Sequence, residues 1–314
     1  MECLIVGTRP QFLKLYGYLK SIESEYRIIH SGQHYDYEMS KTFFDQLKIP
    51  EPDINLGIKI GYWQDQTVRT IRKLSGEFKK VKADSVTVFG DCSTTYGGAI
   101  AAKQANLPLT HVECGYRHVN PIDPEDFIRT VVDHLSNRLI TYNDYAIKNL
   151  IEEGVDSNRI VKSDNVMLRA LKDSVPIAEK EEVSEEFDYL MTLHRSKHKE
   201  KESLSEIMNV LGKIKGKIIF PCHPGTKEKI EEYNISVPAN IELREPLGYI
   251  KFLALFLKSK AIITDSGGIQ VEAFELKKKC ITLNDGTCWL HTLENNMNTT
   301  VGDDFSRILK ILND

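Results

Sequence analysis

The stretch AIITDSGGIQVEAFELKK at residues 261–278 joins a short apolar run, a turn of small residues and a helical pattern. Gly267 and Gly268 allow the backbone to approach a ligand closely, and the N–H groups at a helix start attract phosphate. Ser266 can bind that anion or simply cap the helix, because Asp-Ser-Gly-Gly is also a good turn and N-cap. A strand, a small-residue turn and a helix in this order are typical of a doubly wound α/β fold.

The same alternation extends through the rest of the chain. Short β-branched runs separated by amphipathic segments fill the first half, namely CLIV, RIIHS, SVTVFG, LTHVEC and RLITY. After a charged stretch near residues 176–186 the pattern restarts with FDYLMTLH, KIIFPCH, NIELREPL, AIITDSGG and KCITLND. Such alternation predicts parallel sheets covered by helices. We therefore expect an α/β protein with two Rossmann-like, doubly wound domains, residues 1–175 and 176–314, facing a central cleft.

Composition excludes several classes of function. The 314 residues are 41% hydrophobic, enough for two cores, and the net charge of -4 offers no basic face for nucleic acid or an anionic membrane. No apolar stretch is long enough to span a bilayer, and the opening MECLIVGTRPQF lacks a signal-peptide pattern, so we expect a cytoplasmic protein. Six cysteines without a CxxC pair predict neither a metal site nor disulfides.

Basic residues follow the first predicted strand. CLIV leads into GTRPQFLKL, where Gly7 permits the turn and Pro10 suits the first helical turn. Arg9 leaves the strand end, where it can clamp a pyrophosphate. Lys14 lies about one turn into the helix and either adds positive charge or is an ordinary solvated lysine, the more common fate of a helical lysine.

Three carboxylates occupy similar places in the first domain. Asp91 follows SVTVFG, Glu113 ends LTHVE, and Glu125 opens the helix that contains Arg129. The carboxyl ends of parallel strands share one edge, so the three acids can converge, although each alone could be a helix cap. Glu113 is the strongest candidate, because it interrupts an apolar strand where an unpaired carboxylate is costly to bury. Arg117 is a candidate partner for it.

Histidines and a further glutamate mark the second domain. His194 and its neighbour Arg195 follow a strand in TLHR and can meet phosphate or a developing charge, although a strand-end histidine is more often structural. His223 in PCHPGT is interpreted as structural. Glu272, expected in the first turn of the helix after AIIT, either complements the helix dipole or binds ribose hydroxyls.

Taken together and in this order, GTRPQFLK, GQHYD, GDCSTTYGG, HVECGYR, PEDFIR, TLHR and TDSGGIQVEA resemble the non-hydrolysing UDP-N-acetylglucosamine 2-epimerases. The resemblance covers most of the chain. It implies a GT-B-like fold with UDP held mainly by the C-terminal domain and the sugar facing the N-terminal carboxylates. It also implies a homodimer with a UDP-sugar substrate, and no metal or nicotinamide cofactor.

The resemblance also implies residue roles. Asp91, Glu113 and Glu125 would be the acid/base carboxylates, with His194 near the leaving diphosphate. The implied substrate-binding residues are Arg9, Lys14, Arg129, Arg195, Ser266, Gly267, Gly268 and Glu272. The family reaction eliminates UDP to give a 2-acetamidoglucal and then adds it back, which interconverts UDP-GlcNAc and UDP-ManNAc for surface polysaccharide.

The sequence departs from the family pattern at several positions. Trp289 lies where the family commonly has an arginine, Gln11 replaces a glutamate and Ile128 an asparagine. The tryptophan resembles the branch that acts on UDP-2,3-diacetamido-glucuronate, or serves only packing. The chain also lacks much of the family's usual C-terminal extension, which is expected to alter domain closure. The alternatives are a hydrolysing epimerase, a GT-B glycosyltransferase and a catalytically weak UDP-sugar-binding protein, but three acids favour elimination.

Overall fold

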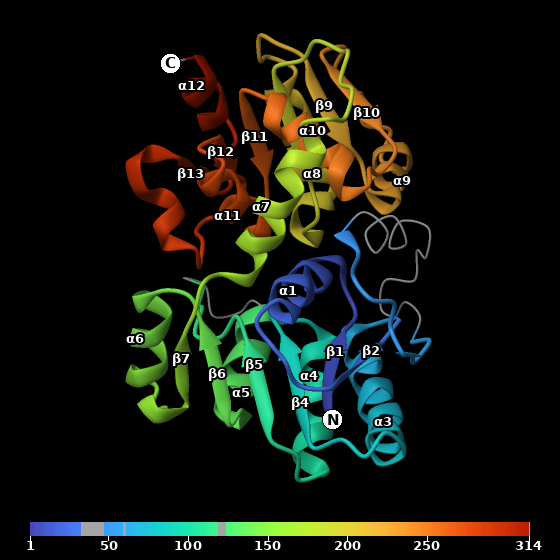
Figure 1. Cartoon of the computed structure of the whole chain (residues 1–314). Helices are drawn as coiled ribbons and strands as arrows, with labels where there is room; N and C mark the ends of the chain where they lie inside the picture. Colours follow the sequence, from blue (N-terminus) through green and yellow to red (C-terminus); the bar gives the residue numbers. More distant parts are fainter. Residues whose placement is uncertain (33–46, 59–60, 119–123, 314) are drawn as a thin grey trace. The chain divides into compact units, whose positions relative to one another are not determined.

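A computed structural model describes residues 1–32, 47–58, 61–118 and 124–313 (Figure 1). The chain divides into two compact units, Met1–Asp173 and Ser174–Asp314, called unit 1 and unit 2 below. The division lies within helix α7 (Val166–Ala178), close to the expected boundary at residues 175/176 and before the charged stretch. The GQHYD motif lies mostly outside the described residues, since residues 33–46 are not among them.

Unit 1 is built on a parallel sheet with the strand order β3-β2-β1-β4-β5-β6-β7 among the described residues. The strands are β1 (Glu2–Val6), β2 (Tyr26–His30), β3 (Ile54–Asn55), β4 (Ser85–Phe89), β5 (Leu109–Val112), β6 (Arg138–Thr141) and β7 (Ile160–Lys162). The helices are α1 (Arg9–Leu19), α3 (Trp63–Lys80), α4 (Ser93–Gln104), α5 (Pro124–Leu135), α6 (Asp144–Glu152) and α7, with a short 3-10 helix at Ser157–Arg159. Apolar side chains of α3, α4 and α5 pack with those of β1, β2, β4 and β5 in one core.

Unit 2 repeats this architecture with the strand order β10-β9-β8-β11-β12-β13, again parallel. The strands are β8 (Tyr189–Thr192), β9 (Ile218–Pro221), β10 (Ile241–Arg244), β11 (Ala261–Thr264), β12 (Lys279–Thr282) and β13 (Asn298–Thr300). The helices are α8 (Lys201–Leu211), α9 (Pro224–Glu232), α10 (Tyr249–Lys258), α11 (Gly267–Glu275) and α12 (Arg307–Asn313), with 3-10 helices at Ser196–Lys199 and Leu290–Asn296. Apolar side chains of α8, α12 and the central strands form its core.

The ten strands expected from the sequence are confirmed, and so is the parallel α/β class. The strands β3, β7 and β13 were not expected. Each has only two or three residues and lies at the edge of its sheet. A short edge strand is exposed along one side and therefore lacks the continuous apolar run that identifies a central strand.

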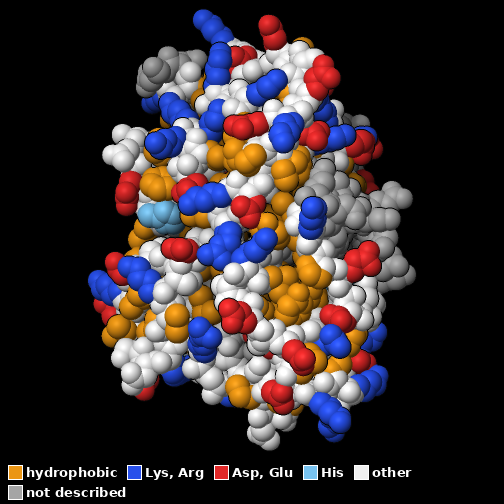
Figure 2. All heavy atoms as spheres, in the orientation of Figure 1, with side chains coloured by type: hydrophobic (Ala, Val, Ile, Leu, Met, Phe, Trp, Pro, Cys, Tyr) orange, Lys and Arg blue, Asp and Glu red, His pale blue; other side chains and the backbone are white. Residues whose placement is uncertain are grey.

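The surface and the thiols agree with the composition. Lysine, arginine and acidic side chains are interspersed on the face drawn in Figure 2. Within the described part of the chain, no helix has both the length and the apolar character needed to cross a bilayer.

All six cysteines are unbridged, and burial raises the pKa of Cys3 and Cys222 to about 11 and that of Cys280 to about 12. Such thiols are poor nucleophiles at neutral pH.

Candidate active site

Two of the predicted acids lie just beyond neighbouring strands of unit 1. Phe89 at the end of β4 pairs with Val112 at the end of β5. Asp91 follows the first strand after one glycine, and Glu113 follows the second directly. The parallel register therefore places both carboxylates at the same edge of the sheet.

Glu113 is buried and ion-paired. Its side chain is 2% exposed, and its Oε1 lies 2.6 Å from Nζ of Lys14 on α1, which is 7% exposed. Within the described residues, Oε2 is buried and has no hydrogen-bond partner. The partner of Glu113 is therefore Lys14, so the candidate Arg117 was wrong. Of the two alternatives for Lys14, added positive charge fits the structure and a solvated lysine does not.

The backbone of Glu113 is unusual as well. Its φ is +74°, in the left-handed region that non-glycine residues rarely adopt. Such a conformation costs on the order of 1–3 kcal/mol and is concentrated at functional sites. The strained backbone therefore independently marks Glu113 as a functional candidate.

Gly90 makes room for the Lys14–Glu113 pair. Its φ is +64°, and a Cβ at this position would lie 2.7 Å from Nζ of Lys14 and 3.8 Å from Oε1 of Glu113. Any side chain here would strain the backbone and push the ammonium group aside. The glycine before Asp91 is therefore needed for both its conformation and its small size.

Asp91 forms the second ion pair of this edge. Its carboxylate accepts a hydrogen bond from the guanidinium of Arg129, whose side chain is 3% exposed on α5. Glu125, at the start of the same helix, is more open, with 44% of its side chain exposed and Oε2 3.9 Å from Nε2 of His118. Asp126, which the sequence did not single out, accepts hydrogen bonds from the backbone and ring of His118.

The turn that carries Arg9 is fixed by Gln11. The Gln11 carbonyl oxygen accepts from the backbone N–H groups of Gly7 and Thr8 at 2.6 and 3.1 Å. Its amide nitrogen donates to the carbonyl of Phe89 at 2.7 Å and to Oγ1 of Thr95. A carboxylate could not donate these last two hydrogen bonds, which explains why glutamine suits this position. Arg9 itself is the first residue of α1 and is partly exposed.

In unit 2, Asp265 organises the segment that carries His194 and Arg195. Its buried carboxylate accepts from the backbone N–H groups of both residues at 2.8–3.0 Å, and from Nδ1 of His198 at 3.0 Å. Burial opposes ionisation of Asp265, but the hydrogen bond from His198 and the backbone donors hold its pKa below the usual value. The His194 residue is exposed. Asp265 was overlooked, although it directly follows β11 as Glu113 directly follows β5.

The glycine turn of unit 2 begins α11 as expected. Ser266 is the N-cap residue, and its side chain makes no capping hydrogen bond. Gly267 and Gly268 are the first helical residues, and a Cβ on Gly267 would lie 2.8 Å from Nε1 of Trp289. Trp289 is 4% exposed, so its indole packs directly beside the turn.

Glu272 lies in the second turn of α11 and is 4% exposed, so the expectation that it complements the helix dipole from the first turn was wrong. Its Oε1 accepts a hydrogen bond from the hydroxyl of Tyr249 at 2.8 Å. Burial raises the pKa of Glu272 to about 7, and the Tyr249 hydrogen bond opposes this shift. His223, which we interpreted as structural, caps α9 by accepting a hydrogen bond from the backbone N–H of Gly225.

Comparisons with known proteins match this chain to one family. A family model described as UDP-N-acetylglucosamine 2-epimerase matches residues 19–314. A Methanococcus maripaludis protein named "UDP-N-acetylglucosamine 2-epimerase homolog" is 38% identical, over 98% of this chain and 90% of its own. A Pseudomonas aeruginosa "UDP-2,3-diacetamido-2,3-dideoxy-D-glucuronate 2-epimerase" is 33% identical, over 95% and 87% of the two chains.

Solved structures show the same fold. The Methanocaldococcus jannaschii UDP-GlcNAc 2-epimerase in complex with UDP-GlcNAc and UDP is 35% identical, with a TM-score of 0.91 over 100% of this chain and 92% of that one. A Rickettsia africae glycosyltransferase, 15% identical with a TM-score of 0.52, shares the fold alone, which confirms the GT-B-like class. The chain therefore belongs to the UDP-N-acetylglucosamine 2-epimerase family of sugar-nucleotide 2-epimerases.

Proposed function

We propose that this enzyme interconverts UDP-GlcNAc and UDP-ManNAc. The observation that carries the proposal is the state of Glu113, a buried glutamate with one oxygen paired to Lys14 and the other without a hydrogen-bond partner among the described residues. Such a carboxylate has an oxygen ready to take a proton. The names of the relatives, most of them UDP-GlcNAc 2-epimerases, supply the choice of sugar.

The proposed reaction begins with elimination. A carboxylate takes the proton on sugar carbon 2, and the electrons of that C–H bond form the double bond between carbons 1 and 2. The bond between carbon 1 and the diphosphate oxygen breaks, and UDP leaves with the electron pair. The product is 2-acetamidoglucal. In the return step UDP attacks carbon 1 again, and an acid delivers a proton to the opposite face of carbon 2.

Each half of this reaction needs acid/base groups, because the proton on carbon 2 is not acidic in the ground state and becomes so only as UDP leaves. We assign this work to Asp91, Glu113 and Glu125, and the stabilisation of the leaving diphosphate to His194. The ion pairs of Glu113 with Lys14 and of Asp91 with Arg129 hold two of these acids in fixed positions.

The substrate contacts remain a proposal from the family resemblance. Phosphate contacts are assigned to Arg9, Arg195, Ser266, Gly267 and Gly268, and ribose contacts to Glu272. In support, the glycine turn begins α11, where helical N–H groups favour an anion. A homodimer also remains a prediction.

A second candidate substrate is a UDP-2,3-diacetamido-glucuronate. The Pseudomonas aeruginosa relative carries that name, and an indole beside Gly267 differs from the arginine expected in the family. The two substrates differ in their substituents at carbons 3 and 5, whereas the reacting carbons are the same. The same assay can therefore test both.

The test is proton NMR of the enzyme with UDP-GlcNAc in deuterated water. Loss of the carbon 2 hydrogen signal together with new UDP-ManNAc signals would support the proposal. Release of free sugar and UDP would favour a hydrolysing epimerase. Unchanged UDP-GlcNAc combined with deuterium exchange in UDP-2,3-diacetamido-glucuronate would transfer the assignment to the second substrate. No exchange in either would contradict both.

A further inference from the structure

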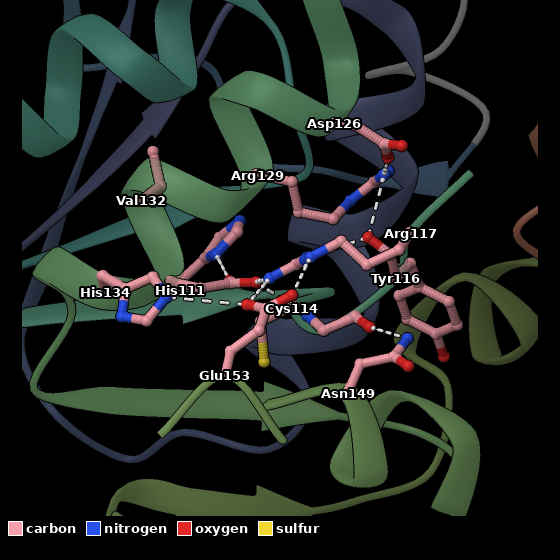
Figure 3. A network of polar contacts seen from close by, with 12 residues as sticks. His111, Cys114, Tyr116, Arg117, Asp126, Arg129, Val132, His134, Asn149 and Glu153 are labelled. Carbon is pink, nitrogen blue, oxygen red and sulfur yellow. Dashed lines mark hydrogen bonds and ion pairs between the residues drawn. The ribbon is translucent and has the colours of Figure 1, made fainter. Parts of the chain in front are cut away.

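A buried histidine links the two strand ends that carry Asp91 and Glu113. His111 lies within β5 and is 0% exposed. Its Nε2 is 2.7 Å from the carbonyl oxygen of Gly90, the residue before Asp91, and its Nδ1 is 2.6 Å from the carboxylate of Asp133 on α5. The ring therefore joins the turn after β4 to a charged residue on α5. Figure 3 shows His111 within the polar contacts of this region.

Asp133 extends this link to the turn after β5. Its second oxygen accepts from the backbone N–H of Gly115 at 3.0 Å and from the guanidinium of Arg117 at 2.8 Å. Gly115 has a φ of +80°, and a Cβ there would lie 2.4 Å from the carbonyl oxygen of Ala146. Asp133 thus fixes the backbone two residues after Glu113.

The contacts return to Asp91 through two arginines. Arg117 donates to the carbonyl of Tyr116 at 2.9 Å, and Arg129 donates to the same carbonyl at 3.4 Å and to the carboxylate of Asp91. In Figure 3 the two side chains come from different elements, Arg117 from the segment after β5 and Arg129 from α5. Together with the peptide bond between Gly90 and Asp91, these hydrogen bonds form a closed circuit, and both acid-bearing turns belong to it.

The two contacts of His111 determine the protonation state of its imidazole ring. A carbonyl oxygen and an ionised carboxylate are both acceptors, so each ring nitrogen of His111 faces an acceptor. Burial opposes ionisation of Asp133, but the hydrogen bonds from His111 and from the backbone of Gly115, together with the charge of Arg117, hold the pKa of Asp133 below its usual value. A neutral imidazole would leave one lone pair against an acceptor oxygen. Only the imidazolium, with both nitrogens protonated, satisfies both contacts.

We propose that His111, held as an imidazolium by Asp133, is a positioning residue that fixes Gly90, and through it Asp91, relative to Glu113. It acts through the backbone and has no assigned contact with substrate. The inference rests on the proposed function for its effect on catalysis. The protonation state of His111 does not depend on that function and can be tested separately.

The first experiment needs no substrate, and a variant enters only to assign the His111 signal. The chain is labelled with ¹⁵N in histidine, and the imidazole signals are recorded at pH 7.5, with His111 assigned from the spectrum of His111→Gln. We expect protons on both nitrogens of His111. A spectrum with a single protonated nitrogen would overturn the proposal, whatever the substrate proves to be.

The second experiment uses Asp133→Asn with a matched control. The amide cannot balance the imidazolium, so we expect kcat for UDP-GlcNAc to fall by roughly 10–100-fold, with KM nearly unchanged, because misplaced acid/base groups weaken only the transition state. Glu153→Gln makes the same chemical change at another partner of Arg117 that does not contact His111, and is expected to change kcat by less than about 2-fold.

The outcomes separate a positioning role from a merely structural one. If Asp133→Asn lowers stability but leaves kcat of the folded enzyme unchanged, the positioning role is wrong. If it fails to fold, the imidazole spectrum of the unmodified chain still tests whether His111 is an imidazolium, and a single ring proton overturns the proposal. If the unmodified enzyme does not act on UDP-GlcNAc at all, the proposed function fails, while two protons on His111 would still support the imidazolium.

Discussion

Two glutamates, one in each unit, are buried to nearly the same depth but have different partners. Glu113 in unit 1 is 2% exposed and lies 2.6 Å from the ammonium group of Lys14. Glu272 in unit 2 is 4% exposed and lies 2.8 Å from the hydroxyl of Tyr249. The depth of burial is nearly equal, so the partner makes the difference.

The partner, rather than the depth of burial, decides how a buried carboxylate is stabilised. An ammonium group supplies the opposite charge, whereas a phenol offers a hydrogen bond but cannot neutralise the carboxylate. Burial therefore raises the pKa of Glu272 to about 7. Under the proposed function, Glu113 exchanges a proton with carbon, and Glu272 only hydrogen-bonds to a ribose.

The largest effect is expected from Glu113→Gln. The amide keeps the shape but cannot accept the proton, so kcat should fall by roughly 10²–10⁴-fold. The measurement is the initial rate together with deuterium exchange at carbon 2. Glu152→Gln, an exposed glutamate on α6, is the matched control and should keep the normal rate. Exchange at the normal rate in Glu113→Gln would remove this residue from the proposed mechanism.

Lys14→Met should produce the next largest effect, this time on stability. It leaves the Glu113 carboxylate buried without its cation, which is expected to lower the free energy of unfolding by about 3–5 kcal/mol. Urea denaturation measures the change, with exposed Lys148→Met as control. The double variant Lys14→Met/Glu113→Gln should recover much of the loss, because no charge is then left unpaired. Losses that simply add would show that the ion pair is not the cause.

Glu272 should make stability depend on pH. Its pKa is raised from 4.5 to about 7 in the folded chain, so the folded state binds a proton that the unfolded state has already lost. The resulting stabilisation is complete below about pH 4.5 and is lost as pH rises to about 7, a change of about 3 kcal/mol. Unfolding of the original chain and of Glu272→Gln is compared between pH 5.0 and 7.5.

The informative quantity is the difference in the free energy of unfolding between those two chains, because other groups titrate in the same pH range. We expect the free energy of unfolding of the original chain, minus that of Glu272→Gln, to fall steadily as pH rises. Tyr249→Phe removes the hydrogen bond that lowers the pKa of Glu272, so the loss of stability should extend to higher pH. Parallel pH profiles for the original chain and Glu272→Gln would show that Glu272 does not titrate there.

The smallest effect is expected at the glycine turn of unit 2. In Gly267→Ala the new methyl group would lie 2.8 Å from Nε1 of Trp289, and such overpacking is expected to lower the free energy of unfolding by about 1–3 kcal/mol. Trp289→Phe removes that nitrogen, so the double variant should lose less than the sum of the single variants. Denaturation midpoints of the four chains measure this coupling, and strict additivity would contradict the contact.

Much of the fold could be predicted from the sequence, because central strands of a parallel sheet are apolar on both faces. The run at β4 and the run at β11 are of this kind, and both were recognised. The edge strand β3 has only two residues, one of them exposed, so its existence depends on pairing with β2 rather than on its own pattern.

The acids of the site could be predicted from the sequence, but the residues that pair with them could not. An acid directly after an apolar strand is visible in sequence, as Glu113 was. Its pairing with Lys14 joins residues 99 positions apart and depends on the space left by Gly90, which no local pattern reveals. His111 could have been noticed as a lone polar ring inside the apolar run LTHVE, but its two acceptors come from other elements.

The central place of β1 in its sheet has a consequence for how the chain is made. β1 pairs with both β2 and β4, yet β2 ends at His30 and β4 begins at Ser85. At 5–20 residues per second, a ribosome needs roughly 3–11 s to add the residues between them. During that interval one side of β1 has no partner strand and could pair with another nascent chain. Shielding of the emerging polypeptide is therefore most needed before β4 has left the ribosome.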